Sequence, residues 1–498
     1  MTAKRTIRTI PQGRTPMPTR PAWERVRTFE EVTTGFSAED ARREAERCIY
    51  CPQKPCSGGC PVGIDIPGFI EQISAGNEHG AFEVLSRSTL LPAVCGRVCP
   101  QESQCEAVCV VGDHLEPVAI GRLERYVGDL AIAEGWTAAA EPEPNGRRVA
   151  VVGAGPAGLA CAADLARAGC DVTIFEALHR PGGVLSYGIP EFRLPRAVVS
   201  AEFAKVEALG VHVEVNSIIG RLFTVDQLRD EMGYDAVFVA TGAGYPAFLG
   251  IPGEGLNDVL SANEFLTRCN LLRAADPASD TPLHIGRRVA VIGAGNTAMD
   301  AMRTSLRLGA EEVRCIYRRS RAECPARAEE LEHAIEEGVV FNWLTSPVEI
   351  LADEEGNVRA VRCVRMDLGE PDASGRRRAE PVPGSEHEIE ADVVVVAIGT
   401  HANPILRQTS RLVTDARGYL VADAHGRTSQ AGVFAGGDIV TGAATVIQAM
   451  GAGRTAAAAM KAYLGLVEPE DRAVADPGED AAFGVDVRQR PFRRIRAA

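Results

Sequence analysis

The stretch RRVAVVGAGPAGLACAADLARAGCDVTIFE, residues 147–176, contains an apolar strand, a glycine-rich turn, a helix and a second strand. A similar stretch, RRVAVIGAGNTAMDAMRTSLRLGAEEVRCIYR, follows at residues 287–318. Each pattern is typical of buried parallel strands joined by a crossover helix that packs on the sheet. An internal repeat of this kind predicts two parallel α/β sheets, one for each copy.

The first glycine turn predicts a dinucleotide site. Gly153 allows the tight turn, Gly155 lets a pyrophosphate approach the backbone, and Gly158 lets the helix pack closely on the strand. Pro156 and Ala157 open the helix, whose N-terminus faces the phosphate charge. The site therefore needs a ligand with a pyrophosphate.

The residue at the end of the second strand predicts which dinucleotide binds there. Glu176 follows Gly158 by 18 residues, and a carboxylate in this place accepts hydrogen bonds from both ribose hydroxyls. It would also repel a 2′-phosphate. We expect FAD or NAD at this site and not NADP.

The second glycine turn differs from the first in two places. It comprises Gly293, Gly295, Asn296, Thr297 and Ala298, with alanine in the third glycine position. Where an NAD site would show an acid, the sequence has Arg318, Arg319 and Arg321. Guanidinium groups can hold a 2′-phosphate through charge-assisted hydrogen bonds, so this site predicts NADPH. The alternative is that these arginines only cover a solvated loop, in which case NADH and NADPH would give equal kinetics.

A flavin site beside an NADPH site predicts hydride transfer from nicotinamide to isoalloxazine. The cofactors supply the reactive atoms in such a reaction, so we assign no side chain a catalytic role. The nine histidines show no ligand spacing.

Eight of the fourteen cysteines form two runs of four near the N-terminus. They are Cys48, Cys51, Cys56 and Cys60, then Cys95, Cys99, Cys105 and Cys109. Thiolates grouped in this way favour iron–sulfur clusters, and in a ferredoxin run the cysteine before proline serves the other cluster. Cys60 precedes Pro61, so it is expected in the second cluster. Two zinc sites are the alternative, although the four- and five-residue gaps are poor zinc-ribbon spacing.

The other six cysteines are expected to be structural. They are Cys161, Cys170, Cys269, Cys315, Cys324 and Cys363. Without a signal segment, fourteen cysteines favour a reducing cytoplasm over a disulfide scaffold. A formal charge of −14 argues against general nucleic-acid binding, and no apolar stretch approaches the length of a membrane span.

The chain is expected to divide into six segments. They are an extended arm at 1–27, a helical domain at 28–140, an FAD domain at 147–282 and 391–470, an NADPH domain inserted at 283–390, and a tail at 471–498, with a linker at 141–146. Ser37 is an expected N-cap, and a polar meander is expected at 352–390 with a surface loop at 370–378. Thr241 and Gly242, after the strand at 235–241, are expected to bind cofactor.

Residues 29–464 resemble the NADPH-dependent iron–sulfur flavoproteins. This family includes the glutamate synthase small (beta) subunit, the large subunit of NADH-dependent ferredoxin:NADP transhydrogenase and the N-terminal half of dihydropyrimidine dehydrogenase. The resemblance rests on CPVGIDIPGFI at 60–70, CGRVCPQESQCEAVCV at 95–110, EPVAIGRLERYV at 116–127 and AGGDIVTGAATVIQAMGAGRTAA at 435–457.

The resemblance implies an α/β protein with a helical iron–sulfur domain and two Rossmann-like, three-layer ββα domains. It implies two 4Fe-4S clusters, one held by Cys48, Cys51, Cys56 and Cys109, the other by Cys60, Cys99, Cys105 and Glu124. A second cluster held by cysteines alone, with Cys95, remains open. The implied flavin contacts are Gly182, Gly183, Leu185, Gly437, Asp438, Thr445 and Val446.

The implied activity is that of a glutamate synthase small subunit. Electrons would pass from NADPH through FAD and the clusters to a large subunit that carries FMN and the amidotransferase, in a hetero-oligomer. A ferredoxin:NADP transhydrogenase subunit with a ferredoxin or flavin partner is the alternative. A third hypothesis, from another class, is a non-catalytic electron-conducting subunit.

Overall fold

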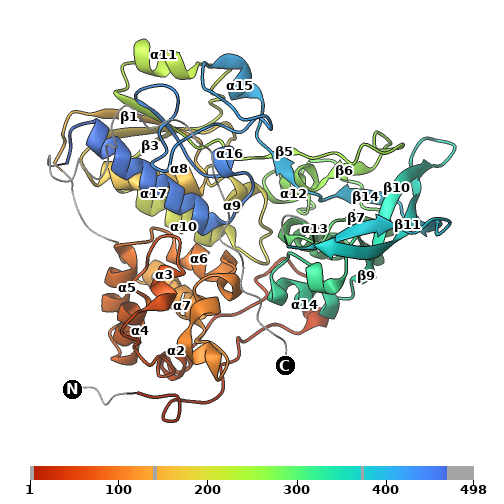
Figure 1. The fold of residues 1–498 in the computed structure, drawn as a ribbon, viewed down its shortest axis with the longest axis horizontal. Coiled ribbons are helices and arrows are strands. Elements are labelled where there is room, and N and C mark those ends of the chain that lie inside the picture. Colours follow the sequence, from red (N-terminus) through yellow and green to blue (C-terminus); the bar gives the residue numbers. More distant parts are fainter. Residues whose placement is uncertain (1–4, 138–142, 372–374, 468–498) are drawn as a thin grey trace.

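The computed structural model describes residues 5–137, 143–371 and 375–467 (Figure 1). A helical region lies below a first parallel sheet, and a second parallel sheet lies beside them. The predicted tail at 471–498, residues 1–4 of the arm and the first two linker residues lie outside the described residues.

The helical region is built from short helices, four of which share one apolar core. The helices are α1 (Ala22–Arg25), α2 (Ala38–Ala45), α3 (Pro55–Gly58), α4 (Ile66–Ser74), α5 (Glu78–Ser86), α6 (Pro92–Val98) and α7 (Ile120–Ala133), with 3-10 turns at Gln101–Ser103, Glu106–Val108 and Val110–Asp113. Ser37 caps α2 as predicted, because its Oγ accepts a hydrogen bond from the Asp40 N–H at 3.1 Å. Ile73 and Leu123 are fully buried in the core.

The first sheet has the order β16-β4-β1-β2-β3, all parallel. Its strands are β1 (Arg148–Val152), β2 (Asp171–Phe175), β3 (His212–Glu214), β4 (Ala236–Val239) and β16 (Val433–Ala435). Helix α8 (Pro156–Ala166) packs against α17 (Val446–Tyr463), where a side chain on Gly453 would meet the Ala157 carbonyl at 2.1 Å. The glycine therefore sets the close approach of these helices.

The second sheet has the order β6-β14-β7-β8-β9, also parallel. Its strands are β6 (Val259–Ser261), β7 (Arg288–Ile292), β8 (Glu312–Tyr317), β9 (Val340–Trp343) and β14 (Val393–Val396). It is covered by α12 (Ala262–Asn270), α13 (Asn296–Arg307) and α14 (Ala328–Glu336). The whole unit is inserted between β4 and β16 of the first sheet, as predicted.

The inserted unit is wider at both ends than the predicted 283–390. At its start, β6 pairs with β14 in the second sheet, and Phe265 of α12 packs in the core of that sheet. At its end, β14 pairs with β7, although the chain was expected to rejoin the first domain at residue 391. Strand pairing thus places 391–396 in the inserted unit.

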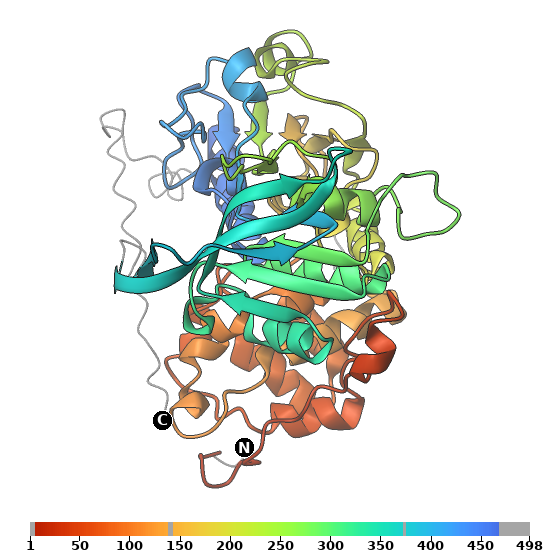
Figure 2. The ribbon, with the colours of Figure 1, turned by 90° about the vertical axis from the view of Figure 1, so that its right-hand side faces the viewer.

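An antiparallel blade crosses the front of the second sheet (Figure 2). It comprises β10 (Thr345–Ala352), β11 (Val358–Pro371), β12 (Arg377–Pro381) and β13 (His387–Glu390). The predicted meander is present. Much of the predicted loop at 370–378 is the paired ends of β11 and β12, and 372–374 lie outside the described residues.

The remaining elements are short and connect these units. They are α9 (Val184–Tyr187), α10 (Arg196–Glu207), α11 (Val225–Asp230), α15 (Ile405–Thr409), α16 (Asp438–Thr441), a 3-10 turn at Arg321–Glu323, β5 (Tyr245–Pro246) and β15 (Thr400–His401). Across the residues that the structure describes, no helix combines the length and apolar character needed to cross a bilayer.

Candidate functional site

The first glycine turn joins β1 to α8 at the carboxyl edge of the first sheet. Gly153 has a φ of +108°, and a side chain there would lie 2.5 Å from the Ala240 carbonyl. A side chain on Gly158 would lie 1.9 Å from the Gly153 carbonyl. Gly155 has no such obstacle, since the nearest atom to its side-chain position is Gly183 Cα at 4.0 Å. Two glycines thus serve packing, and Gly155 leaves backbone accessible to a phosphate.

Glu176 lies buried at the end of β2, beside this turn. Its two carboxylate oxygens accept hydrogen bonds from the backbone N–H groups of Ala154 and Leu178, each at 2.8 Å. Burial raises the pKa of Glu176, while these hydrogen bonds lower it. Each oxygen retains a second lone pair, so the carboxylate can still accept a bond from a ribose hydroxyl.

The other predicted flavin contacts surround the same turn. Gly182 and Gly183, with φ of +111° and +55°, lead into α9, where Leu185 is buried. Gly437, with a φ of +76°, leads into α16, and Asp438 is its first residue. The structure therefore brings these residues together from four segments of the chain.

Two buried polar atoms at this edge have no hydrogen-bond partner among the described residues. They are Thr241 Oγ1, just after β4, and Asp438 Oδ1. Burial raises the pKa of Asp438 to about 6. Buried polar atoms without partners are rare, and polar groups of a ligand would satisfy both. The residues around the first turn thus fit a dinucleotide.

The second glycine turn repeats this backbone between β7 and α13. Gly293 has a φ of +126°, and a side chain there would lie 2.3 Å from the Ala397 carbonyl. Gly295 has open space, and Asn296 and Thr297 are exposed at the start of α13. Ala298 is fully buried, so the third position accommodates a methyl group here.

The predicted arginines after β8 do not form one cluster. Arg318 is exposed, while Arg319 is buried and its Nε donates to the Arg377 carbonyl at 2.8 Å. Arg321 pairs with Glu332 on α14. Arg319 therefore holds the β11–β12 hairpin instead of extending from the strand end beside Arg318.

The β11–β12 hairpin carries an arginine, Arg377, that the sequence pattern did not place near the second site. Arg377 lies on β12, and its Nε is 2.7 Å from Glu323 Oε1 in the turn that follows Arg321. The signal in the sequence was the run Arg376, Arg377 and Arg378 within the polar meander. Because this run is far from the second glycine turn along the chain, the sequence did not show that Arg377 pairs with Glu323.

The first set of thiols lines one apolar cavity. Cys48, Cys51, Cys56 and Cys109 face it, together with Ile66, Ile70, Val111 and Val118. Burial, together with the neighbouring thiols, raises the pKa of Cys48 to about 12 and that of Cys56 to about 11. Four thiolates could share this space only if cations such as iron neutralised them.

The second set adds a carboxylate to the thiols. The charge of Glu124 helps to raise the pKa of three thiols, those of Cys60, Cys99 and Cys105, so the carboxylate lies close to all of them. Burial is the main cause of the raised pKa for Cys60 and Cys105. Glu124 is 6% exposed, and its Oε1 has no partner. Burial raises its pKa to about 8. An orphaned buried carboxylate among thiols fits a ligand to a cluster.

Cys95 lies beside the same set and faces the first nucleotide unit. Its Sγ is 3.7 Å from Met450 Sδ on α17, and 3.9 Å from Thr89 Oγ1. A hydrogen bond with Cys99 and burial raise the pKa of Cys95. The structure thus places both predicted candidates, Glu124 and Cys95, beside Cys99.

Helix α17 joins the second thiol set to the first glycine turn. Thr445 caps α17, and its Oγ1 accepts a hydrogen bond from Gln104 Nε2 at 3.4 Å. Val446 begins the helix, and a side chain on Gly451 would lie 2.9 Å from the Pro61 carbonyl. The N-terminal half of α17 therefore contacts the loops that carry Cys60 and Cys105.

The other six cysteines are not grouped in this way. Five are buried and Cys324 is partly buried, and all six are free thiols. Cys315 and Cys324 lie 3.3 Å from the carbonyls of Gly293 and Ala294, respectively, and so pack behind the second turn. Within the described ranges, no three His, Cys, Asp or Glu side chains converge as around a single metal ion.

The fold and the two glycine turns define a protein with two nucleotide-binding units and an N-terminal cysteine-rich unit. Residues 147–458 match the family of pyridine nucleotide-disulphide oxidoreductases, and residues 25–136 match dihydropyrimidine dehydrogenase domain II, a 4Fe-4S domain. The chain belongs to the pyridine nucleotide-disulphide oxidoreductase family and carries this 4Fe-4S domain at its N-terminus. The predicted fold class and the class of enzyme are thus confirmed.

Two relatives cover most of the chain. The small chain of glutamate synthase [NADPH] from Halomonas elongata is 38% identical over 469 residues, 91% of this chain and 97% of its own. The beta subunit of NADP(+)-dependent formate dehydrogenase from Moorella thermoacetica is 41% identical over 86% of this chain and 64% of its own. The predicted relation to glutamate synthase small subunits is confirmed.

A solved structure shares the fold. Mycobacterium tuberculosis FprA, solved in complex with NADPH, superposes with a TM-score of 0.56 at 23% identity, over 66% of this chain and 86% of its own. FprA supports the arrangement of the two nucleotide-binding units.

Proposed function

We propose that this chain is the NADPH-oxidising subunit of a glutamate synthase. Electrons would enter at the second glycine turn, cross the first, and leave through the thiol sets to a large subunit that forms L-glutamate from 2-oxoglutarate and glutamine. The small-chain relative, which matches nearly end to end, supports this assignment. When bound, FAD and NADPH supply hydride transfer, and 4Fe-4S clusters supply one-electron transfer.

The contact between α17 and the second thiol set carries the proposal. Thr445 meets Gln104, and Met450 meets Cys95, so the flavin edge of the first unit directly faces the second thiol set. The first thiol set lies in a separate cavity, and its Cys51 is only partly buried. The chain therefore offers an ordered route from the flavin unit to its own surface.

The proposed binding groups of the two nucleotide units have opposite charges, acidic at the first turn and basic at the second. Around the first turn we assign the pyrophosphate to the start of α8 and the ribose to Glu176, which fits FAD. Around the second we assign the pyrophosphate to the start of α13 and the 2′-phosphate to Arg318, with Arg377 beside it. On this proposal the FAD domain is formed by 147–258 and 397–467, and the NADPH domain by 259–396.

Two clusters, rather than one, are proposed from the two separate thiol sets. The first would take Cys48, Cys51, Cys56 and Cys109, and the second Cys60, Cys99, Cys105 and Glu124. Replacing Glu124 by alanine should lower the iron content by about half and remove one cluster EPR signal, while Cys95→Ala should keep both. Cys363→Ala, a buried thiol in the blade, is the matched control. The reverse outcome for Glu124 and Cys95 would assign the ligand to Cys95.

The decisive assay is glutamate formation by the chain together with a glutamate synthase large subunit. We expect NADPH oxidation coupled to glutamate formation only when both subunits are present, in a stable hetero-oligomer, and flavin bleaching by NADPH in the small subunit alone. Bleaching without any coupled glutamate would overturn the glutamate synthase assignment. Loss of bleaching itself would leave only a non-catalytic, electron-conducting subunit. The free thiols favour the cytoplasm as its compartment.

A second acceptor is favoured by one observation. The formate dehydrogenase subunit is 41% identical over most of this chain, so the same electron-input unit serves a different complex in that organism. If ferredoxin, and not the glutamate synthase large subunit, oxidises the NADPH-reduced protein, the ferredoxin:NADP alternative replaces the first proposal.

A further inference from the structure

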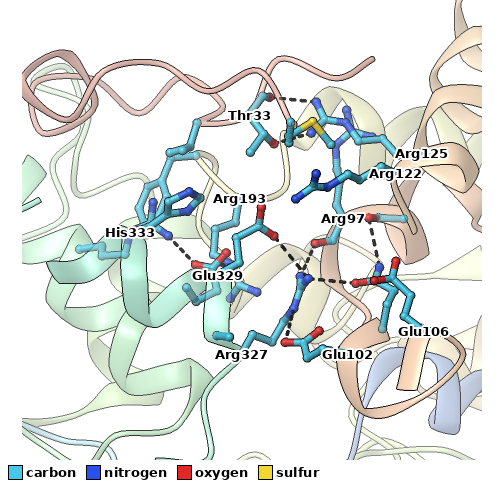
Figure 3. Close-up of a pocket in the computed structure, with 18 of the residues that line it drawn as sticks. Thr33, Arg97, Glu102, Glu106, Arg122, Arg125, Arg193, Arg327, Glu329 and His333 are labelled. Carbon is cyan, nitrogen blue, oxygen red and sulfur yellow. Dashed lines mark hydrogen bonds and ion pairs between the residues drawn. The ribbon is translucent and has the colours of Figure 1, made fainter. Parts of the chain in front are cut away.

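A cavity of about 190 Å³ lies where the arm, the cluster domain and both nucleotide units meet (Figure 3). Arg14 comes from the arm, Arg122 from α7, Arg193 from the first unit, and Arg327 and His333 from the second unit. Its volume equals that of roughly six liquid waters. The cavity is therefore large enough for a small ion or organic acid and too small for a nucleotide.

All four carboxylates that line this cavity are neutralised by arginines that also line it. Glu106 pairs with Arg14 at 2.6 Å, and Glu330 pairs with Arg193 at 3.1 Å. Glu102 and Glu329 both pair with Arg327, each at 3.4 Å. Every lining carboxylate is therefore engaged with an arginine, although Glu102 and Glu329 share one.

Two more arginines of the lining pair with acids that do not line the cavity. Arg97 pairs with Glu31 and Asp129 at 2.7 and 2.5 Å. Arg125 pairs with the same two acids at 3.0 and 3.2 Å. These four side chains form a closed network that fixes the upper wall.

Arg303 also lines the cavity and pairs with Glu330 and Glu337. Among the described residues, this leaves Arg122 as the lining arginine without a carboxylate partner. Its one hydrogen bond goes to the Thr15 carbonyl at 2.9 Å, and among the described residues no carboxylate lies within ion-pair distance of its guanidinium. Burial and the neighbouring Arg14 lower its pKa, although an arginine remains charged at any physiological pH. A partly buried guanidinium with only a carbonyl partner retains several unused donors.

His333 provides a second unsatisfied donor on the opposite wall. It is 9% exposed and lines the cavity from α14 (Figure 3), and its Nδ1 has no hydrogen-bond partner among the residues that the structure describes. Burial and the charge of Arg303 lower its pKa, so the imidazole is neutral at pH 7 and can present an N–H. Arg14 Nε is also buried without a partner.

The start of α14 adds to the positive potential of the cavity. Ala328, Glu329 and Glu330, the first turn of this helix, line it, and no side chain caps that helix end. Uncapped N–H groups at a helix start favour an anion. An anion could thus accept hydrogen bonds from all of these donors: Arg122, His333, Arg14 and the start of α14.

We propose that this cavity binds a small oxyanion with at least two charged oxygens, between Arg122 and His333. Inorganic phosphate and short dicarboxylates share this chemistry. Because the walls belong to the arm, the cluster domain and the second nucleotide unit, the anion would bridge all three and stabilise their arrangement. The inference does not depend on the proposed function, since binding can be measured without NADPH or a partner.

The test is calorimetric titration of the purified full-length holoprotein with phosphate, with succinate, and with sodium chloride at matched ionic strength. We expect saturable, one-site binding of phosphate or succinate and none of chloride, and the tighter of the two identifies the ligand class. Thermal unfolding should show a saturable rise in Tm with the same ligand.

Arg122→Gln should weaken binding at least tenfold, and His333→Phe should weaken it several-fold. Arg407→Gln, which removes an exposed charge on α15, should leave it unchanged. Iron content and the visible spectrum check that each variant keeps its clusters and flavin. If Arg122→Gln fails to fold, His333→Phe carries the test.

Two results would overturn the proposal. One is a thermal shift that follows ionic strength and is equal for all three salts, which would mean general screening. The other is unchanged affinity in the variants at positions 122 and 333, which would place any bound anion elsewhere.

Discussion

The two glycine turns have the same backbone and differ in what surrounds them. Both place a glycine with positive φ under the carbonyl of a neighbouring strand, Gly153 under Ala240 and Gly293 under Ala397. The first lies beside two acids, the buried Glu176 and the partly buried Asp438, whereas Arg318 and Arg319 follow β8 beside the second. The shared part fixes where a pyrophosphate can lie, and the surroundings select which nucleotide carries it.

The largest expected effect comes from making the first turn like the second. Gly158→Ala would place a methyl group 1.9 Å from the Gly153 carbonyl, whereas the corresponding Ala298 fits its own turn. We expect a loss of about 3 kcal/mol in the free energy of unfolding and release of FAD on purification. Thermal unfolding and the flavin-to-protein ratio measure this.

Gly59→Ala would make a poor control, because it also clashes, with Val108. Gly255→Ala is suitable instead, since no atom lies within 4 Å of the added methyl group. If Gly158→Ala keeps the stability and flavin content of the unmutated protein, α8 can move away from β1. The steric difference between the two turns would then be contradicted.

The second prediction concerns the acids of the first turn. The pKa of Asp438 is about 6 in the folded chain, above its ordinary 3.8, so ionisation opposes folding. The flavin-free protein should lose stability from this group as pH rises from about 4 through 6, by about 3 kcal/mol in total.

Asp438→Asn should remove this loss, so the variant should match the parent near pH 4 and exceed it in stability at pH 8. Denaturant unfolding across this range measures the difference. A difference between the two proteins that is the same at every pH would contradict a titrating buried carboxyl. Asp280→Asn, an exposed acid in the loop before β7, is the control.

The sequence predicted the parts of this comparison that are local. Glycine spacing and apolar runs identified both turns and both insertions of a helix between strands, since these patterns reflect short-range geometry. The sequence did not show that β14, a run of four valines, pairs with β7 and not with the first sheet. Such a strand fits any buried position, and its partner is decided by tertiary packing.

Charge placement around the second turn was also only partly predictable. Arg318, Arg319 and Arg321 stand together in the sequence, but Arg319 is buried against the hairpin, and Arg377 of that hairpin pairs with Glu323 in the turn after Arg321. A residue some sixty positions away cannot be assigned to a turn from local spacing. The grouping of the eight cysteines into two sets likewise came from the family resemblance, apart from Cys60.

A third prediction tests whether the hairpin belongs to the second site. Arg377→Ala should weaken binding of 2′,5′-ADP about tenfold, as expected for loss of one charge-assisted contact of about 1.4 kcal/mol, and leave NADH binding unchanged. Trp343, whose ring centroid lies 4.8 Å from that of Phe341, offers a fluorescence signal because it pairs with Tyr317, the residue before Arg318.

Arg365→Ala is the matched control, because Arg365 is an exposed arginine on β11 of the same blade. Equal weakening of 2′,5′-ADP binding by both variants would point to the general charge of the blade. Equal weakening of 2′,5′-ADP and NADH by Arg377→Ala would mean that the hairpin only supports the fold.

The smallest effect is expected from making the second turn like the first. Ala298→Gly removes a fully buried methyl group from the first turn of α13 and adds backbone freedom to the helix. The helix propensity of glycine alone predicts a loss of about 1 kcal/mol, and NADPH affinity should hardly change, because the pyrophosphate approaches Gly295 and not this position. Thermal unfolding and 2′,5′-ADP titration measure the two quantities. If Ala298→Gly instead costs as much as Gly158→Ala, the methyl group is an essential spacer between α13 and β7, and the two turns use opposite means to set the same helix-to-strand distance.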